Sequence, residues 1–117
     1  MLRDENNVAI RNYSLSIHLI NSIIWGSLDN ELSLDLNQAI TLAEMDHCIY
    51  KSKSNYNAWG SNNLRNIDPM YKDVNLWDLS LKAGSPAINQ ADQTNSCSTD
   101  INDKTRDAQP DIGAFEF

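Results

Sequence analysis

A chain of 117 residues with 16 acidic and 9 basic side chains is long enough for one domain with a real hydrophobic core. Its formal net charge of −7, without any run of Lys or Arg, argues against nucleic acid and anionic membrane surfaces as partners. The longest mostly apolar stretch, residues 19–25, is far shorter than the roughly 20 residues of a spanning helix, and residues 1–7 lack the apolar centre of a signal peptide.

Short polar residues dominate the composition, because 15 Asn, 12 Asp and 12 Ser make up a third of the chain. These residues compete with the helical backbone and favour turns. They alternate with Ile, Leu, Trp and Tyr in a regular way that a disordered chain does not need. The composition therefore predicts many short strands separated by turns.

Three segments alternate apolar and polar side chains with the period of half-buried strands: residues 13–19, 32–37 and 77–81. In the last of them, Trp77, Leu79 and Leu81 share one predicted face. Residues 36–45 can also be read with helical spacing, so a short helix there is an alternative to a strand or turn.

A weak repeat connects residues 21–27, 46–52 and 67–73, with spacings of 25 and 21 residues. Each segment places an aromatic residue (Trp25, Tyr50, Tyr71) after a large apolar one. This period suits one turn of a β-solenoid, whose coils stack at about 4.8 Å per layer and align like residues in columns. A β-sandwich is the alternative, but it usually needs Asn-Gly or Asp-Gly hairpins and the chain contains neither dipeptide.

The last third of the chain carries three blocks in order: residues 66–71 (NIDPMY), 79–89 (LSLKAGSPAIN) and 111–117 (DIGAFEF), with Arg106 before the last. Together with residues 21–26 (NSIIWG), they resemble the closing signature of secreted bacterial right-handed parallel β-helix proteins. These are the pectin-lyase-like proteins of the choice-of-anchor Q type, common in Bacteroidetes. The resemblance covers roughly residues 12–117. The chain departs from the pattern at Asn89-Gln90-Ala91 and at Asp103, which stands where the pattern has Gly.

The resemblance implies an all-β fold, a right-handed parallel β-helix of about three coils with an irregular C-terminal cap. We expect a single domain over residues 1–117, with coils in residues 8–90 and a cap in residues 91–117, where Ile112, Ala114 and Phe115 contribute a closing strand. The resemblance also implies a longer, secreted or cell-surface parent protein. An uncapped coil edge around residues 8–19 then predicts a homodimer through that edge, unless residues 1–7 cap it.

A polar segment with two aromatic residues is the best candidate for contact with a polysaccharide. Tyr56 and Trp59 lie among Asn residues that include Asn62 and Asn63, and sugar recognition uses aromatic stacking and amide hydrogen bonds. The alternative is that these aromatic residues pack onto the coil beneath them. Lys51 and Lys72 share a repeat column and are expected to form a basic strip, unless they only solubilise the strands.

Acidic residues of the tail offer a minor calcium hypothesis, with Asp100, Asn102 and Asp103 as ligands. The EF-hand pattern fails, because Lys104 stands where a ligand belongs, and Asx turns on a solvated face are the alternative. No other cofactor is expected.

The two cysteines and two histidines give weaker signals. Cys48 and Cys97 are candidates for a disulfide bridge, and Cys48 is otherwise a buried apolar residue. His18 and His47 fall in different repeat columns and belong to no nucleophile or metal motif, so they are interpreted as surface residues.

The sequence thus predicts a C-terminal capping part of a secreted or surface β-helix protein, structural in role and with possible glycan contact. One alternative is part of a polysaccharide lyase or glycosidase whose active site lies mainly in upstream coils. β-Elimination needs a base beside a group that neutralises the substrate carboxylate, and no such pair is evident, so an enzyme is disfavoured for this chain alone. The other alternative is a module that self-associates through an open coil edge.

Overall fold

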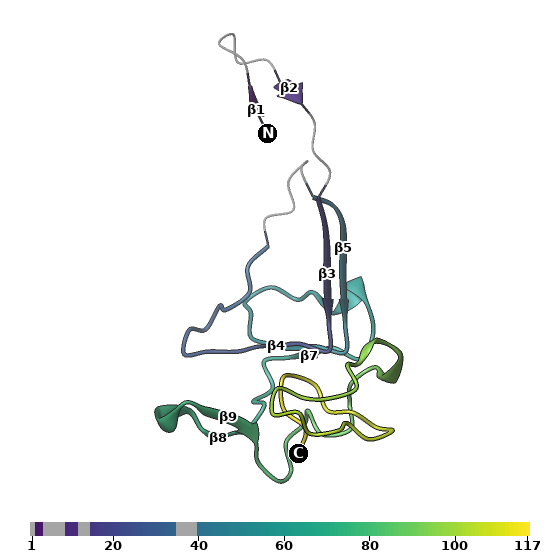
Figure 1. Cartoon of the computed structure of the whole chain (residues 1–117). Helices are drawn as coiled ribbons and strands as arrows, with labels where there is room; N and C mark the ends of the chain where they lie inside the picture. The colour runs from purple at the N-terminus through teal and green to yellow at the C-terminus, as the bar shows by residue number, and fades with distance from the viewer. Residues whose placement is uncertain (1, 4–8, 12–14, 35–39) are drawn as a thin grey trace.

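The computed structural model describes residues 2–3, 9–11, 15–34 and 40–117 (Figure 1). These residues form mostly short strands and irregular segments, with three 3-10 turns and no α-helix in the described ranges. The elements are β1 (Leu2–Arg3), β2 (Ala9–Arg11), β3 (Leu15–Ile20), β4 (Ile23–Ile24), β5 (Ile40–Asp46), β6 (Ile49–Tyr50), η1 (Asn57–Trp59), β7 (Leu64–Arg65), β8 (Tyr71–Asp73), η2 (Val74–Leu76), β9 (Asp78–Leu81) and η3 (Gln93–Asn95).

Two small parallel sheets form the centre of the molecule, β3–β5 and β4–β6–β7. Figure 1 shows β3 and β5 upright, with β4 and β7 running across their lower end. The predicted parallel pairing of strands is confirmed for these two sheets, but no closed or solenoid sheet is present among the described residues. β1–β2 and β8–β9 pair antiparallel.

The register of the layers differs from the sequence repeat. Residues 26 apart face each other in the first two layers, so Ile24 lies opposite Tyr50. The third layer follows after only 15 residues and places Arg65 beside Tyr50. The predicted aromatic column of Trp25, Tyr50 and Tyr71 is therefore wrong, because Tyr71 belongs to the β8–β9 hairpin.

Three residues in the same register position make a turn just before the three strands of the β4–β6–β7 sheet. Asn21, His47 and Asn62 have φ values of 53°, 52° and 59°, in the left-handed region that Asn and His adopt more readily than other residues with a side chain. Backbone hydrogen bonds tie the layers together here, from Asn21 N–H to the Asp46 carbonyl (3.1 Å) and from His47 N–H to the Ser61 carbonyl (2.9 Å). We call these three residues the corner.

Two apolar clusters bury opposite faces of the β4–β6–β7 sheet, because successive side chains of a strand point to opposite sides. Tyr50 enters the first cluster, which is built from Met45, Cys48, Tyr50 and Tyr56 with Leu19, Ile24, Leu32, Leu34 and Trp59 packed against them. Ile49 enters the second cluster, with Leu81, Ala87 and Ile112 and the partly buried Ile23 and Leu64. The tail of the chain thus covers one face of this sheet, and Ile112 does so from an irregular segment, where a closing strand was predicted.

The predicted alternation is confirmed in part. Ser16 and His18 are exposed while Ile17 and Leu19 are half-buried, as expected for a strand, and residues 13–14 lie outside the described residues. Residues 32–34 are irregular, yet Leu32 and Leu34 still pack into the first cluster. Residues 40–46 form a strand, which argues against the helical alternative there; residues 36–39 are not described.

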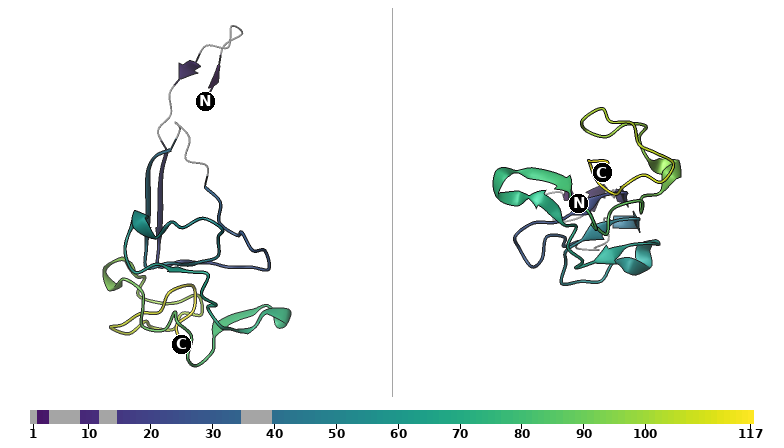
Figure 2. Two further views of the ribbon diagram at one scale, coloured as in Figure 1. Left: turned by 180° about the vertical axis from the view of Figure 1, so that it is seen from behind. Right: turned by 90° about the horizontal axis from the view of Figure 1, so that it is seen from below.

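The β8–β9 hairpin forms without an Asn-Gly or Asp-Gly turn. Asp73 accepts hydrogen bonds from the N–H groups of Asn75 and Leu76, and Trp77 closes the turn with φ 58°. The hairpin projects to one side of the body in both vertical views (Figures 1 and 2). Trp77 is therefore 86% exposed, and of the predicted buried face only Leu81, at the hairpin base, is buried.

Candidate functional site

The aromatic residues of the predicted glycan site belong to the core. Tyr56 is buried, and its hydroxyl oxygen accepts a hydrogen bond from Leu34 N–H at 3.0 Å. Its ring lies against Trp59, with 4.5 Å between ring centroids, and Trp59 is half-buried on the first cluster. The structure thus places Tyr56 where a sugar has no access, as the packing alternative predicts.

Of the two asparagines of that segment, Asn62 belongs to the corner and Asn63 follows it. Asn63 bridges two layers, since its Oδ1 accepts from Cys48 N–H (3.0 Å) and its Nδ2 donates to the Met45 carbonyl (2.8 Å). Asn62 is exposed, and its amide lies 3.0 Å from Nε2 of His47. Asn63 therefore acts as a structural side chain that completes backbone hydrogen bonding.

The two lysines of the predicted basic strip are not in one column. Lys51 lies over the ring of Trp25, with Nζ 4.9 Å from its centroid, and donates to the Gly26 carbonyl at 3.0 Å. Lys72 is exposed on β8 in the hairpin. Because the two residues belong to different parts of the fold, they do not form a joint anion site.

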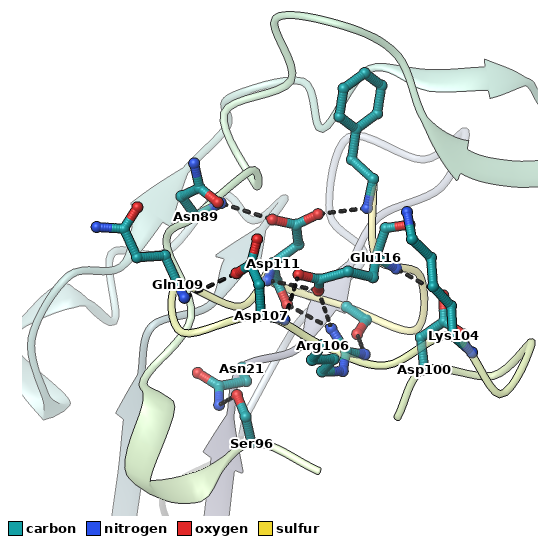
Figure 3. A network of polar contacts seen from close by, with 12 residues as sticks. Asn21, Asn89, Ser96, Asp100, Lys104, Arg106, Asp107, Gln109, Asp111 and Glu116 are labelled. Atoms are coloured by element: carbon teal, nitrogen blue, oxygen red, sulfur yellow. Dashed lines mark hydrogen bonds and ion pairs between the residues drawn. The ribbon is translucent and has the colours of Figure 1, made fainter. Parts of the chain in front are cut away.

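Asp100 has a structural function in the tail, which Figure 3 shows in detail. Its carboxylate accepts N–H groups of Glu116 (2.9 Å), Lys104 (2.9 Å) and Asn102 (2.8 Å). These donors, first of all the Glu116 N–H, hold the pKa of Asp100 below its usual value. Of the other two predicted calcium ligands, Asn102 and Asp103 are exposed, and Asp103 adopts φ 61°. The geometry corresponds to the Asx-turn alternative.

Arg106, Asp111 and Glu116 of the tail meet with Asn89 in one polar network (Figure 3). Arg106 pairs with Glu116 at 3.0 Å, and their side chains are only 9% and 4% exposed. The same guanidinium donates to the carbonyl groups of Asp111 (3.0 Å) and Gly113 (2.8 Å). The Asp111 carboxylate accepts N–H groups of Asn89 and Phe117. The motif residues therefore fix the path of the tail across the sheet.

Both cysteines are free in the structure, so the predicted bridge is not formed. Cys48 is buried, its thiol points to the Leu19 carbonyl at 3.2 Å, and burial raises its pKa. Cys97 is exposed on the tail. Cys48 thus corresponds to the alternative of a buried apolar residue.

The two histidines differ in their surroundings. His18 is exposed on β3, and its Nδ1 lies 2.7 Å from Oε2 of Glu44 on β5. His47 is partly buried at the corner, close to Asp46 and Asp92. The sequence analysis did not predict this cluster of three residues. The adjacent Asp46 and His47 were visible in the sequence, but nothing there indicated that Asp92 of the tail returns to them.

A cleft of about 450 Å³ lies between the tail, the hairpin and β4. Its lining includes Ile23, Leu81, Phe115 and Tyr71. None of the lining residues carries a charge, and burial raises the pKa of Tyr71, the one residue there that can ionise. The cleft therefore contains no acid–base pair.

Among the described residues, one edge of the two parallel sheets has no strand partner. No strand among the described residues pairs with the other side of β3 or β4. Asn21 N–H points to β5, so the alternation of a parallel pair turns the N–H groups of His18 and Ile20 to the open side. The Ile20 carbonyl accordingly points away from β5 and accepts the Ser22 hydroxyl at 2.8 Å. Within the described ranges, this edge of β3 and β4 therefore has no strand partner.

Neither a protein-family model nor a curated protein sequence matches this chain. Across the part of the chain that the structure describes, no helix has the length and apolar character needed to span a membrane. The open edge, the corner and the tail network are therefore the features from which a function can be inferred.

Proposed function

We propose that the chain is the C-terminal capping part of a right-handed parallel β-helix protein of the pectin-lyase-like, choice-of-anchor Q type, secreted or exposed at a cell surface. Its role in this proposal is structural. The coils continue an array of upstream coils in the parent protein, and the tail packs on one face of the β4–β6–β7 sheet.

The observation that carries this proposal is the repeated corner. Asn21, His47 and Asn62 make the same left-handed turn in three successive layers, and each turn connects a strand or extended segment to a strand of the β4–β6–β7 sheet. A turn that repeats in register allows another layer to stack with the same geometry, which is the defining property of a solenoid.

The open side of β3 and β4 supports the same proposal. Unpaired N–H and C=O groups along a strand edge favour pairing with another strand, and natural proteins cover or block such edges. An upstream coil of the parent chain would cover this edge continuously over both sheets. Without it, we expect a second copy of the chain to pair there.

The tail accounts for the capping part of the role. It buries one face of the β4–β6–β7 sheet through Ile112 and holds its own path through the Arg106–Glu116 pair. The lyase alternative gains nothing from the lysines, because Lys51 and Lys72 lie apart from each other.

The test is the association of the chain through the β3 edge. His18→Pro removes an N–H on the open side without removing a β3–β5 hydrogen bond, and His18→Ala is the matched control that loses the same contact with Glu44. Light scattering over a range of concentrations should show association for the unchanged chain and for His18→Ala, and a monomer for His18→Pro.

Hydrogen exchange gives a second measurement that needs no variant. The His18 amide should become protected at high protein concentration, whereas the Leu19 amide, which faces β5, should be protected at every concentration. A chain that stays monomeric with an unprotected His18 amide at all concentrations, or a His18→Pro variant that associates as strongly as His18→Ala, would contradict the proposal.

A further inference from the structure

Three side chains from distant parts of the chain converge at the corner. Asp46 ends β5, His47 is the corner residue after it, and Asp92 lies in the tail before η3. One nitrogen or oxygen atom of each lies within 4.8 Å of the other two. This set offers one imidazole nitrogen and two carboxylate oxygens to a single point.

Nδ1 of His47 has no hydrogen-bond partner among the described residues, although the atom is buried. Its distance to Oδ1 of Asp46 is 3.4 Å, and the His47 side chain as a whole is 20% exposed. A buried polar atom that lacks a partner is uncommon and costs stability, so it requires an explanation. A bound cation would supply the missing partner.

Both carboxylates are held in place by other groups. Oδ1 of Asp46 accepts the N–H and the hydroxyl of Ser61, each at 2.9 Å. Asp92 accepts Thr94 N–H at 3.2 Å through Oδ1 and the Asn95 amide through Oδ2. A carboxylate has about four lone-pair positions, so each group keeps capacity for a metal ion.

The corner itself fixes the position of Asp92. Oδ1 of Asn21 accepts Asp92 N–H at 2.6 Å, and Nδ2 of Asn21 donates to the Asp92 carbonyl at 2.9 Å. Asn21 stands one layer above His47 in the corner, so the same column that places His47 also places Asp92 beside it. The three ligand groups are therefore preorganised by the fold.

The amide of Asn62 provides the remaining element of a histidine metal site. As placed, Nδ2 of this amide lies 3.0 Å from Nε2 of His47. A 180° flip of the amide exchanges Nδ2 for Oδ1 at this position, and Oδ1 then accepts Nε2–H and leaves the lone pair of Nδ1 for a metal; ligating histidines almost always have such a second partner.

We propose that Asp46, His47 and Asp92 bind a divalent first-row transition ion, of which Zn²⁺ is the probe. One imidazole and two carboxylates suit such an ion, whereas Ca²⁺ takes oxygen ligands only. The ion joins the tail, through Asp92, to the corner of the coils. Because it binds only the folded arrangement, it stabilises the closed cap.

The experiment compares His47→Asn with His18→Ala, both in a Cys97→Ser background that removes the exposed thiol as a competing ligand. Asn is the matched replacement at position 47, because Asn21 and Asn62 adopt the same left-handed turn. Zn²⁺ binding is measured by calorimetry, and the Tm is measured with and without the ion. We expect Zn²⁺ to bind and to raise the Tm in the background protein and in His18→Ala.

In His47→Asn the affinity should fall by at least about 100-fold, since loss of an outer-shell partner alone costs 10–100-fold. Asp92→Asn should lose affinity similarly while it retains the turn cap, because Asn also caps well. Asn62→Ala should lose about 10-fold. The proposal is overturned if Zn²⁺ does not bind the background protein, if His47→Asn binds it equally well, or if Ca²⁺ gives the same stabilisation.

Discussion

Asn66 forms with the backbone of Ser52 both hydrogen bonds that a neighbouring strand would form. Oδ1 of Asn66 accepts Ser52 N–H at 2.9 Å, and Nδ2 of Asn66 donates to the Ser52 carbonyl at 3.1 Å. Asn63 also bonds to the neighbouring layer through both atoms of its amide, accepting Cys48 N–H and donating to the Met45 carbonyl. The side-chain amides of Asn63 and Asn66 thus continue the pairing between layers where the strands end.

Asn66→Asp tests this role. The change removes the amide donor and turns a carboxylate towards the Ser52 carbonyl, and Ser52 is fully buried. We expect a loss of about 1 kcal/mol in the free energy of unfolding, measured by urea titration. Asn75→Asp is the control, because the Asn75 side chain forms no hydrogen bond with the residues that the structure describes. This variant should change the free energy of unfolding little. Equal losses for the two variants would argue against the amide role.

The buried Arg106–Glu116 pair should be costly to break. Arg106→Ala leaves the Glu116 carboxylate 4% exposed without its cation, and removal of one partner of a buried pair typically costs about 3 kcal/mol or more. Lys104→Ala, at an exposed position, should cost less than about 0.5 kcal/mol. The double variant Arg106→Met with Glu116→Met should be more stable than Arg106→Ala. If Arg106→Ala unfolds at the urea concentration of the unchanged chain, the tail network contributes little.

The stability of the fold should decrease in acid partly because of Asp100. Its pKa is lowered in the folded state by the N–H groups of Glu116, Lys104 and Asn102, so the folded protein binds this proton more weakly than the unfolded chain. The resulting stabilisation is present above the unfolded pKa of about 3.9 and is lost as the pH falls through the folded pKa.

Unfolding free energies between pH 7 and pH 2 check this expectation. Asp100→Asn should show a shallower decline below about pH 4 than the unchanged chain. Asn102→Ala, which keeps its backbone N–H, should keep the original slope. A slope that Asp100→Asn leaves unchanged would show that other carboxylates control the acid transition.

The sequence predicts which segments are extended better than it predicts the register between the layers. Alternation places β3 and the inward-facing Leu32 and Leu34 correctly. It misaligns the third layer, because the loop around η1 returns to the sheet after 15 residues, while the aromatic repeat suggested 21. Coils of unequal length have no constant sequence period. Tyr71 matches the sequence repeat although it lies in the β8–β9 hairpin.

The candidate site shows a different limit of sequence reasoning. Tyr56 stands in a polar segment that reads as a surface loop, yet its side chain is buried and its N–H donates to the Tyr50 hydroxyl at 2.9 Å. Burial of a single aromatic residue has no periodic signal. The meeting of His47 with Asp92 depends on the path of the tail, which long-range hydrogen bonds to Asn21 determine.

Close approach of the backbone at Gly60 gives a last prediction. A Cβ at this position would overlap the carbonyl oxygen of Met45, a backbone atom that cannot move away by a side-chain rotation. Gly60→Ala should therefore cost about 2 kcal/mol, in the range of overpacked sites. Gly84→Ala is the matched control, since Gly84 has φ 85° but open space around it, and it measures the backbone strain alone, about 1 kcal/mol.

Hydrogen exchange of the His47 amide separates the effect of the Gly60–Met45 contact from that of backbone strain. If Gly60→Ala pushes the η1 loop away from Met45, the amide of His47, which bonds to the Ser61 carbonyl at 2.9 Å, should exchange faster. Gly84→Ala should leave that amide protected. A Gly60→Ala variant with full stability and a protected His47 amide would mean that the loop does not lie against β5 as closely as the structure places it.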